Sequence, residues 1–210
     1  MCNYKKRKVS LGFTDEEYDL PLHMCYIYQD DDERMETIGK FIKSGLEAGD
    51  KVYYFVDTLS IDEMKEKLLE SGVSKEAFEQ EHIRLRHSKS VYYPEGSFDV
   101  DSVLGTVKQV YSEELGNGYN VRNTGEMSWA LRDVPGSEHL IEYEAKINIL
   151  ANDTPINGIC QYDARKFTGA TIMDVLAVHP YSIISGQVIK NPFYTPPEEF
   201  LEKYLSKQAR

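Results

Sequence analysis

Two short apolar segments carry the residues of this sequence whose types and spacing could do chemistry. His23 and Cys25 lie two positions apart in the segment 23–28, and Cys160 lies within the segment 158–163. Residues two apart on a strand face the same side of a sheet. Each segment ends in tyrosine and polar residues just before a predicted helix start, a pattern typical of buried parallel strands that carry a site at their carboxyl ends. The two segments therefore predict a pocket.

Thiol and imidazole groups could do two kinds of chemistry in that pocket. With His179, which ends a predicted helix, these residues make a donor set suited to tetrahedral zinc or another soft divalent metal. Alternatively, Cys160 or Cys25 could act as a nucleophile or redox thiol with His179 or His23 as its base. The simpler explanation is that both cysteines line the core or the pocket, since buried cysteines are common. His179 precedes Pro180 and could equally complement a helix C-terminus.

Further polar and aromatic positions extend the candidate site. Glu144 falls near the apolar stripe of a predicted helix, so its carboxylate would face the sheet and need a partner such as Arg122 or Tyr162, unless it reaches water. Glu126 and Trp129 follow the fourth predicted strand, where Trp129 could instead plug the edge of the core. The candidate ligand-binding residues are His23, Cys25, Tyr28, Glu126, Trp129, Glu144, Cys160, Tyr162, Asp163 and His179.

Alternating strand-like and helix-like segments must position these residues. Apolar, β-branched runs predict strands, and helical stripes with capping residues predict the helices between them. The alternation indicates an α/β fold of three layers, with a mainly parallel central sheet flanked by helices, then a C-terminal β-hairpin over 182–189 and a final helix from Thr195. The predicted strands are 23–28, 52–56, 83–86, 120–124 and 156–162; the predicted helices are 34–46, 99–115, 137–150 and 171–178, with another starting at Ser60.

Length and composition predict one globular unit. The chain has 210 residues, 41% of them apolar and 28% charged, enough for one sizeable core. We expect residues 20–210 to form a single domain behind an N-terminal tail of residues 1–19. No apolar run reaches the roughly 20 residues of a membrane-spanning helix, and the start lacks the apolar stretch of a signal peptide. We therefore expect a cytoplasmic protein, with no membrane partner, whose three cysteines stay reduced.

Charge and absent motifs narrow the function further. With 24 basic and 35 acidic residues the net charge is −11, which repels phosphate backbones. The one dense basic run, residues 5–8, falls in the predicted disordered tail, so no direct nucleic-acid binding is expected. The sequence contains no G-x-x-x-x-G-K-[ST], G-x-S-x-G, H-E-x-x-H or C-x-x-C motif. ATP hydrolysis of the P-loop type is therefore not expected, and no catalytic motif marks an enzyme.

Several blocks, in order over residues 20–205, resemble the MEDS domain, a sensory domain named for methanogen and methylotroph regulators and for DcmR. The resemblance implies a RecA-like fold, related to circadian-clock and recombination ATPases, that has lost the phosphate-binding loop. It also implies sensing of simple hydrocarbon derivatives such as one-carbon compounds. The family's His-Cys pair, Cys-x-Tyr-Asp and His-Pro correspond here to His23 and Cys25, to Cys160, Tyr162 and Asp163, and to His179. The blocks are His23-x-Cys25, 41–50, 125–129, Glu142-Tyr143-Glu144, 160–163, His179-Pro180 and 191–194.

Together these observations predict a stand-alone, non-catalytic sensory domain that binds a small molecule. Because no residues remain for an output module, signalling would pass through a separate histidine kinase or transcription regulator, and a homodimer is compatible with this interpretation. No cofactor is expected apart from the metal considered above. Two alternatives stay open. One is a thiol-dependent or metal-dependent enzyme that uses Cys160 or Cys25 with His179 or His23, and the other is a degenerate RecA-like nucleotide binder.

Overall fold

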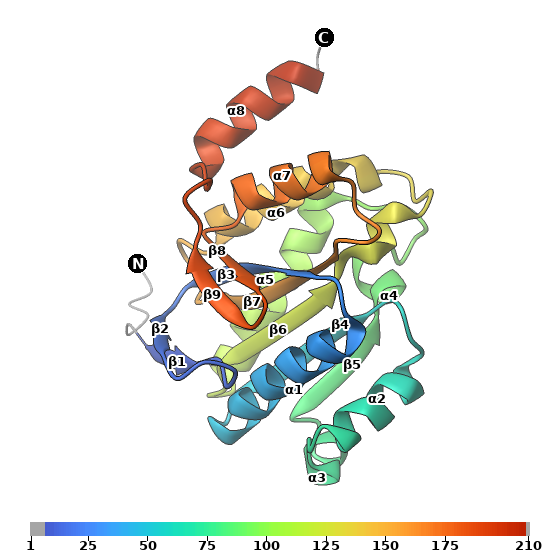
Figure 1. Ribbon diagram of the computed structural model, residues 1–210, viewed down its shortest axis with the longest axis vertical. Coiled ribbons are helices and arrows are strands. Elements are labelled where there is room, and N and C mark those ends of the chain that lie inside the picture. The colour runs from blue at the N-terminus through green and yellow to red at the C-terminus, as the bar shows by residue number, and fades with distance from the viewer. Residues whose placement is uncertain (1–6, 209–210) are drawn as a thin grey trace.

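A seven-stranded sheet forms the centre of the computed structural model, which describes residues 7–208 (Figure 1). All neighbouring strands pair in parallel except the last two, which form an antiparallel hairpin at one edge. Parallel strands need crossover connections, which place helices on the faces of the sheet. The strand order is β5 (Ile83–His87), β4 (Lys51–Val56), β6 (Val121–Glu126), β7 (Asn157–Asp163), β3 (Leu22–Tyr28), β8 (Tyr181–Ile184) and β9 (Gln187–Lys190).

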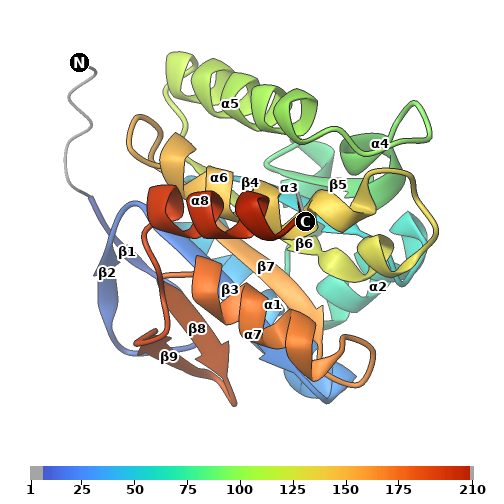
Figure 2. The same ribbon diagram turned by 90° about the horizontal axis from the view of Figure 1, so that it is seen from above.

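Two groups of helices cover the two faces of the sheet. One face packs against α1 (Asp31–Glu47), α2 (Ile61–Glu70) and α3 (Lys75–Glu79). The other packs against α4 (Ser88–Tyr92), α5 (Val100–Gly116), α6 (Leu140–Leu150) and α7 (Gly169–Val178), with 3-10 turns at Met127–Leu131 and Ser137–His139. The last helix, α8 (Pro197–Gln208), rests on α6 (Figure 2). Within residues 7–208, no helix combines the length and apolar character needed to cross a membrane.

Strand register places the chemistry-bearing residues side by side. Between β3 and β7, His23 is opposite Gly158 and Cys25 is opposite Cys160; between β6 and β7, Gly125 is opposite Cys160. Paired residues of parallel strands present their side chains to the same face, and residues two apart on one strand do so as well. These five positions therefore all face the side of α5, α6 and α7.

The three-layer α/β fold predicted from the sequence is confirmed. Each of the five predicted central strands is present within two residues of its predicted bounds, and the C-terminal hairpin turns at Ser185 and Gly186. The short helices α3 and α4 were not predicted. Each has five residues, too few to show a helical apolar stripe in the sequence.

Residues 8–19, predicted as tail, instead form a small antiparallel hairpin of β1 (Lys8–Ser10) and β2 (Glu17–Asp19). Val9 and Leu11 are buried in the same core as α1. Burial of these apolar side chains explains why the segment is ordered, although its basic neighbours give the sequence a polar character. Residues 1–6, which include Cys2 and part of the basic run, lie outside the described residues.

A buried ion pair ties the amino-terminal end of the sheet to α1. The guanidinium of Arg122, on β6, is fully buried and lies 3.2 Å from the carboxylate of Asp50. It also donates to the carbonyl oxygens of Phe41 at 2.9 Å and Ser10 at 3.1 Å. Gly45 on α1 permits this approach, since a Cβ there would lie 2.7 Å from the Arg122 Nε. Asp50 and these carbonyls are therefore the partners of Arg122, which the sequence analysis had considered as a partner for Glu144.

Replacing Asp50 by alanine should lower the free energy of unfolding by about 3–5 kcal/mol, because it leaves a buried guanidinium without its counter-charge. Urea denaturation followed by circular dichroism measures this change. The matched control is Glu36→Ala, which removes an exposed ion pair with Lys40 on α1 and should cost less than about 1 kcal/mol. An Asp50→Ala variant as stable as the parent would show that Arg122 reaches water.

Candidate functional site

Four polar side chains from four elements converge in the core between α6 and the sheet. Glu144 comes from the middle of α6, His23 from the start of β3, Cys160 from the middle of β7 and His179 from the residue after α7. All four are buried. Ile147, almost one turn beyond Glu144, packs into the same core, so this face of α6 directs the carboxylate toward the sheet. The cluster thus lies on the face of the sheet that packs against α6. The sequence analysis had expected it at the carboxyl edge of the sheet.

The four side chains lie at contact distances from one another. Oε2 of Glu144 is 3.0 Å from His23 Nε2, 3.4 Å from His179 Nε2 and 3.4 Å from Cys160 Sγ. Cys160 Sγ is 3.6 Å from His23 Nε2. The two imidazole rings lie 4.2 Å apart between centroids. A single carboxylate oxygen therefore faces two imidazole nitrogens and one sulfur at once.

The outer nitrogen of each imidazole is held by a hydrogen-bond acceptor. Nδ1 of His179 lies 2.8 Å from the carbonyl oxygen of Val175. Nδ1 of His23 lies 3.2 Å from Oδ1 of Asn148, whose amide nitrogen donates to the carbonyl oxygen of Val178 at 2.7 Å. Because both neighbours accept, Nδ1 carries the proton in each ring. The Nε2 atom of each ring therefore faces the cluster, where it directs a lone pair inward when the ring holds no second proton.

Burial and mutual contact set the charges in the cluster. Burial alone would raise the pKa of Glu144, but His179 and His23 outweigh it and hold that pKa well below its usual range. Burial, and then the charge of Glu144, raises the pKa of the Cys160 thiol. Burial also lowers the pKa of His23. The hydroxyl of Tyr162 donates to the other carboxylate oxygen of Glu144 at 2.6 Å, so the expected Tyr162 partner is present.

A small cavity borders this cluster on the side of β6. His23 and Cys160 line it, and it offers about 20 Å³ to water-sized molecules. Gly125 and Gly158, on neighbouring strands, form part of its wall, and Tyr143 of α6 covers it. One water molecule needs roughly 10–15 Å³ measured in this way. The cavity therefore admits a molecule of one or two heavy atoms next to two members of the cluster.

A second, mostly apolar cleft runs beneath α5. It offers about 40 Å³ and is lined by side chains that include Phe55, Val91 and Val110. Val107 and Asn123 line both the cleft and the cavity. These two side chains therefore stand between the cleft under α5 and the cavity beside the cluster.

Glu126 lies elsewhere, at the carboxyl edge of the sheet on the α1 side. Its Oε1 accepts from Arg34 Nη1 at 2.9 Å and from the Tyr54 hydroxyl at 2.8 Å. Its Oε2 accepts from the backbone N–H groups of Asp57 at 3.0 Å and Thr58 at 2.7 Å. Burial would raise the pKa of Glu126, but Arg34 and Thr58 bring it below the usual range. Its oxygens are satisfied by the protein itself, which is the pattern of a structural ion pair.

Tyr28 and Asp163 end two neighbouring strands at the same carboxyl edge and contact arginines. Asp163 accepts from the Nε and Nη2 atoms of Arg165, both at 2.8 Å. These hydrogen bonds lower the pKa of Asp163 to about 2. The guanidinium of Arg34 lies over the Tyr28 ring, 5.2 Å from its centroid. These two candidate residues thus belong with the ion pairs of the carboxyl edge and lie apart from the cluster beneath α6.

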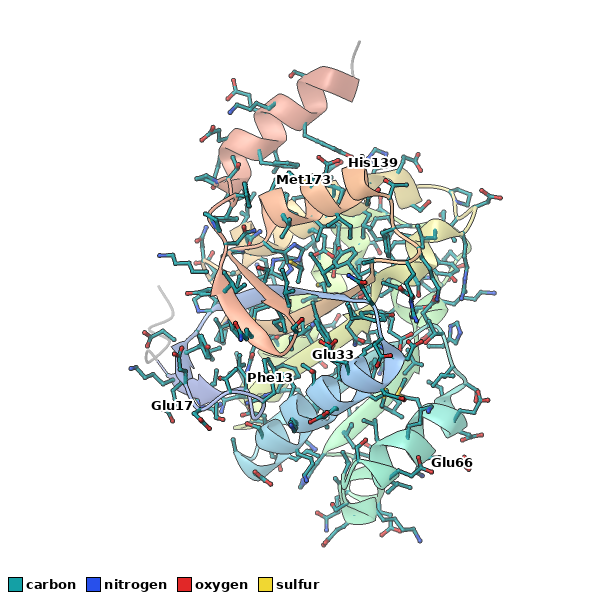
Figure 3. The ribbon with its side chains drawn as sticks, viewed as in Figure 1. Phe13, Glu17, Glu33, Glu66, His139 and Met173 are labelled. Carbon is teal, nitrogen blue, oxygen red and sulfur yellow. The ribbon has the colours of Figure 1, made fainter. Side chains whose placement is uncertain are left out.

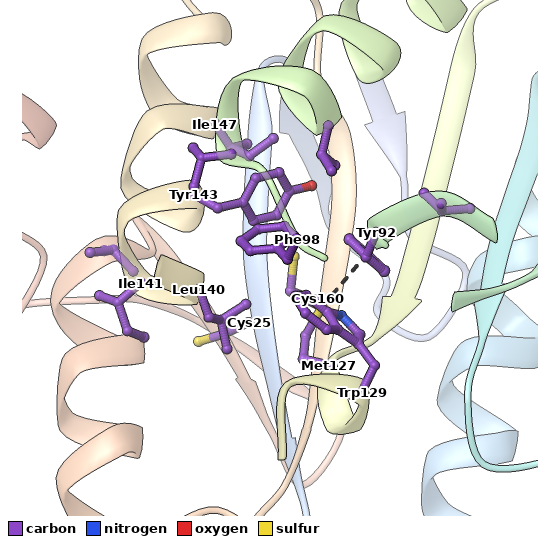
Figure 4. Close-up of a cluster of buried hydrophobic side chains, with 14 of the residues drawn as sticks. Cys25, Tyr92, Phe98, Met127, Trp129, Leu140, Ile141, Tyr143, Ile147 and Cys160 are labelled. Carbon is purple, nitrogen blue, oxygen red and sulfur yellow. Dashed lines mark hydrogen bonds between the residues drawn. The ribbon is translucent and has the colours of Figure 1, made fainter. Parts of the chain in front are cut away.

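Trp129 packs within an aromatic core next to Cys160 (Figure 4). Its indole is stacked on Tyr92 at 4.7 Å and 15°, and lies 4.8 Å from the ring of Phe98. Trp129 is fully buried. It therefore acts as a plug beside the cluster and makes no polar contribution to it.

Cys25 lies outside the donor cluster although it is opposite Cys160 in the sheet. Its thiol is 3.7 Å from the carbonyl oxygen of Tyr181, on the β8 side. Burial raises the pKa of this thiol too. The donor set considered from the sequence, Cys25, Cys160, His23 and His179, is therefore replaced by one in which the carboxylate of Glu144 takes the fourth place.

The start of α1 is acidic, at the place where a helix following the first central strand would hold a phosphate group. The carboxylate of Asp30 accepts from the backbone N–H of Glu33 at 2.8 Å, and Asp31, Asp32 and Glu33 occupy the first turn. Figure 3 labels Glu33 on α1. Helix N-termini attract anions through free N–H groups and the helix dipole. Here carboxylates already occupy that position and repel phosphate, which argues against a nucleotide site at this helix.

The sequence analysis did not predict three residues of the site: Asn148, Asn123 and Val107. Asn148 lies four residues after Glu144, so the helical period places it on the same face of α6. That spacing was a usable signal. Asn123 and Val107 had no such signal, because their role follows from how α5 packs against β6.

Comparison with known proteins identifies relatives over most of the chain. A family model described as the MEthanogen/methylotroph, DcmR Sensory domain (MEDS) matches residues 22–180, a region that contains every candidate site residue. The transcriptional repressor DcmR of Methylorubrum extorquens is 26% identical over 159 residues, which cover 75% of this chain and 57% of that protein. The chain thus spans somewhat more than half the length of this curated relative.

Solved structures share the fold at low sequence identity. A KaiC-like protein from Pyrococcus horikoshii superposes with a TM-score of 0.62 at 17% identity, covering 84% of this chain and 80% of that one. The flagellar accessory protein FlaH from Methanocaldococcus jannaschii superposes with a TM-score of 0.54 at 11% identity, covering 79% and 74%. At these identities the likeness concerns the fold alone, and it confirms the RecA-like α/β fold.

The two described cysteines should be poor nucleophiles in the native protein. In a Cys2→Ser background, we expect iodoacetamide to alkylate Cys25 and Cys160 roughly 100-fold or more slowly at neutral pH than in urea, because each unit of raised pKa lowers the thiolate fraction about tenfold. Intact-mass time courses measure both rates. Rapid alkylation of either native cysteine below pH 7 would support the thiol-dependent enzyme instead.

Asp163 should contribute stability that disappears in acid. Its folded pKa, about 2, lies below the unfolded value of about 3.9, so its contribution is complete above pH ~4 and is lost as pH falls toward ~2. Asp163→Asn should therefore unfold more easily than the parent at pH 7, with the difference shrinking between those pH values. Urea titrations at several pH values test this, with the exposed Asp15→Asn as control. A difference independent of pH would contradict the ion-pair account.

Proposed function

This chain belongs to the MEDS family of sensory domains, and on that basis we propose that it binds a small molecule beside the cluster beneath α6 and takes part in transcriptional regulation. The proposed ligand class is a simple hydrocarbon or one-carbon derivative.

The observation that carries the proposal is a buried nitrogen without a hydrogen-bond partner, in a cluster of which two other members, His23 and Cys160, line an internal cavity. Among the described residues, Nε2 of His179 is buried without a hydrogen-bond partner. A buried polar group without a partner costs about 1–3 kcal/mol. A bound molecule or ion that supplies the partner recovers this free energy, which is the physical basis of binding here.

The dimensions of the cavity restrict the ligand to very small molecules. About 20 Å³ beside His23 and Cys160 accommodates one or two heavy atoms, which suits a one-carbon compound better than a sugar or a nucleotide. The neighbouring cleft under α5 is mostly apolar. It provides a route for a molecule of low polarity, with Val107 and Asn123 at the boundary.

Binding accounts for the site better than thiol catalysis does. Burial raises the pKa of both described thiols, whereas a nucleophilic cysteine needs a lowered pKa. The outer nitrogens of His23 and His179 are held by acceptors, which fixes ring orientation. A rigid, buried set of acceptors recognises a ligand without transferring a group to it.

The output of the proposed sensor follows from its relative and from the position of α8. The relative DcmR is named a transcriptional repressor, so we propose a transcription regulator or a histidine kinase as the element that receives the signal. α8 rests on α6 and touches α7. The two helices that deliver Glu144 and lead to His179 therefore also support α8, which could pass a change at the cluster to a partner.

Differential scanning fluorimetry with methanol, methylamine, methanethiol and chloromethane tests the proposal. At about 100 times its Kd, a ligand adds ~2.7 kcal/mol to stability, which corresponds to a rise in Tm of roughly 5–10 °C for a chain of this size. At least one compound of the panel should raise Tm. The absence of a shift with every compound would contradict the proposal.

Val107→Phe should abolish that shift, because the added ring fills the space between the cleft and the cavity. Lys108→Phe adds the same ring on the exposed side of α5 and should retain it. Comparing the two variants distinguishes a block of access to the cavity from a general effect of the added ring on α5. An equal shift in Val107→Phe and the parent protein would place the binding site elsewhere.

A further inference from the structure

We propose that His23, Glu144, Cys160 and His179 bind a divalent metal ion, for which zinc is the best match. The four donor atoms come from β3, α6, β7 and the end of α7, and all lie within 4.8 Å of one another. The site itself is argued without reference to the proposed sensory function. Only its role as the anchor for a sensed molecule rests on that function.

The orientation of the lone pairs requires a positive charge at the centre of the cluster. Because Nδ1 of each imidazole donates to an acceptor, a ring that holds no second proton points its Nε2 lone pair at the carboxylate of Glu144. Three groups that all accept repel one another unless a cation lies between them. Protons on the imidazoles are one source of that charge. A metal ion is the one that satisfies all four donors simultaneously.

The spacing of the donors matches a four-coordinate ion. Zinc binds nitrogen and oxygen at about 2.0–2.2 Å and sulfur at about 2.3 Å, so tetrahedral donors lie roughly 3.3–3.6 Å from one another. The distances from Glu144 Oε2 are 3.0, 3.4 and 3.4 Å, and Cys160 Sγ is 3.6 Å from His23 Nε2. The two remaining pairs, His23 with His179 and Cys160 with His179, lie within 4.8 Å, so the His179 ring must move toward the other donors to complete the coordination shell.

Charge balance favours a divalent ion in this buried place. A metal-bound cysteine is deprotonated, so Cys160 and Glu144 would contribute two negative charges and the two neutral imidazoles none. The sum with a divalent cation is zero, which removes the cost of burying a net charge. One sulfur, two imidazole nitrogens and one carboxylate oxygen form a donor set that suits zinc and disfavours magnesium or calcium.

The second layer of contacts resembles that of established metal sites. Metal-bound histidines commonly donate their other ring nitrogen to a carbonyl or amide oxygen, and bound carboxylates are themselves hydrogen-bonded. Here Val175 and Asn148 accept from the two histidines, and Tyr162 donates to the distal oxygen of Glu144. The cavity lined by His23 and Cys160 gives a small coordinating molecule a place beside the metal.

Cobalt titration tests the site directly, in full-length Cys2→Ser protein made without a polyhistidine tag and stripped with chelator. Equimolar Co²⁺ should bind with micromolar affinity or better and produce a thiolate charge-transfer band in the near ultraviolet, and Zn²⁺ should displace it. Elemental analysis of the protein as purified should find close to one equivalent of zinc or a related metal. Less than about a tenth of an equivalent, together with no cobalt band, would overturn the proposal and leave protons as the source of charge.

Matched variants distinguish this site from adventitious binding. Cys160→Ser should remove the charge-transfer band, whereas Cys25→Ser, the same change at the opposite position of β3, should keep it. Glu144→Gln, which retains an acceptor for Tyr162, should weaken cobalt affinity by more than the 10–100-fold that loss of an outer-layer contact costs. Circular dichroism confirms that each variant is folded. An unchanged band in folded Cys160→Ser, or unchanged affinity in folded Glu144→Gln, would overturn the assignment. Because these measurements need no sensed compound, a failed metal site would leave the thermal-shift result intact.

Discussion

The carboxylate of Glu144 is buried in the interior of the protein, and several surrounding elements supply the groups that compensate its charge. A buried carboxylate is tolerated only with partners close by. α6 presents Glu144 toward the sheet, the start of β3 and the end of α7 bring the two imidazoles to it, and the middle of β7 supplies a thiol and a tyrosine hydroxyl. β3 and the three consecutive elements α6, β7 and α7 therefore meet at a single side chain.

Glu126 and Glu144 are buried carboxylates on opposite faces of the sheet, and the two carboxylates have different partners. On the α1 side, Glu126 meets a guanidinium, a hydroxyl and backbone N–H groups, so its charge is fully compensated by the protein. On the α6 side, Glu144 accepts from the Tyr162 hydroxyl and faces the Nε2 atoms of two histidines, whose Nδ1 atoms are held by other acceptors. The first arrangement closes the carboxyl edge, and the acidic first turn of α1 repels phosphate there. The second arrangement leaves a demand for a cation or a donor, next to a cavity.

Much of the fold could be predicted because its signals are local. β3 and β4 are short apolar runs, and Asp99 and Ser60 cap the helices that they precede. Which residues form the cluster was harder to predict from the sequence, because it depends on the order of the strands in the sheet. His23 and Cys160 meet only since β7 pairs with β3. Cys25 satisfies the same alternation as His23, yet its thiol lies against Tyr181 of β8. The sequence showed Glu144 as a carboxylate on the apolar stripe of a helix. Its partners could not be predicted, because they lie on other elements that only the tertiary fold brings close.

The way in which the cluster is assembled also decides how a change within it would spread. His179 follows directly on α7, and Glu144 sits in the middle of α6, so any change in charge or coordination at their contact acts on both helices. Close-packed interiors transmit such shifts because they have little free volume to absorb them. α8 lies on α6 and touches α7, whereas α1 and α2 lie across the sheet and take no part in these contacts. Because α5 also packs on α6, the helices α5 to α8 are the elements through which we propose that the state of the buried cluster reaches the surface.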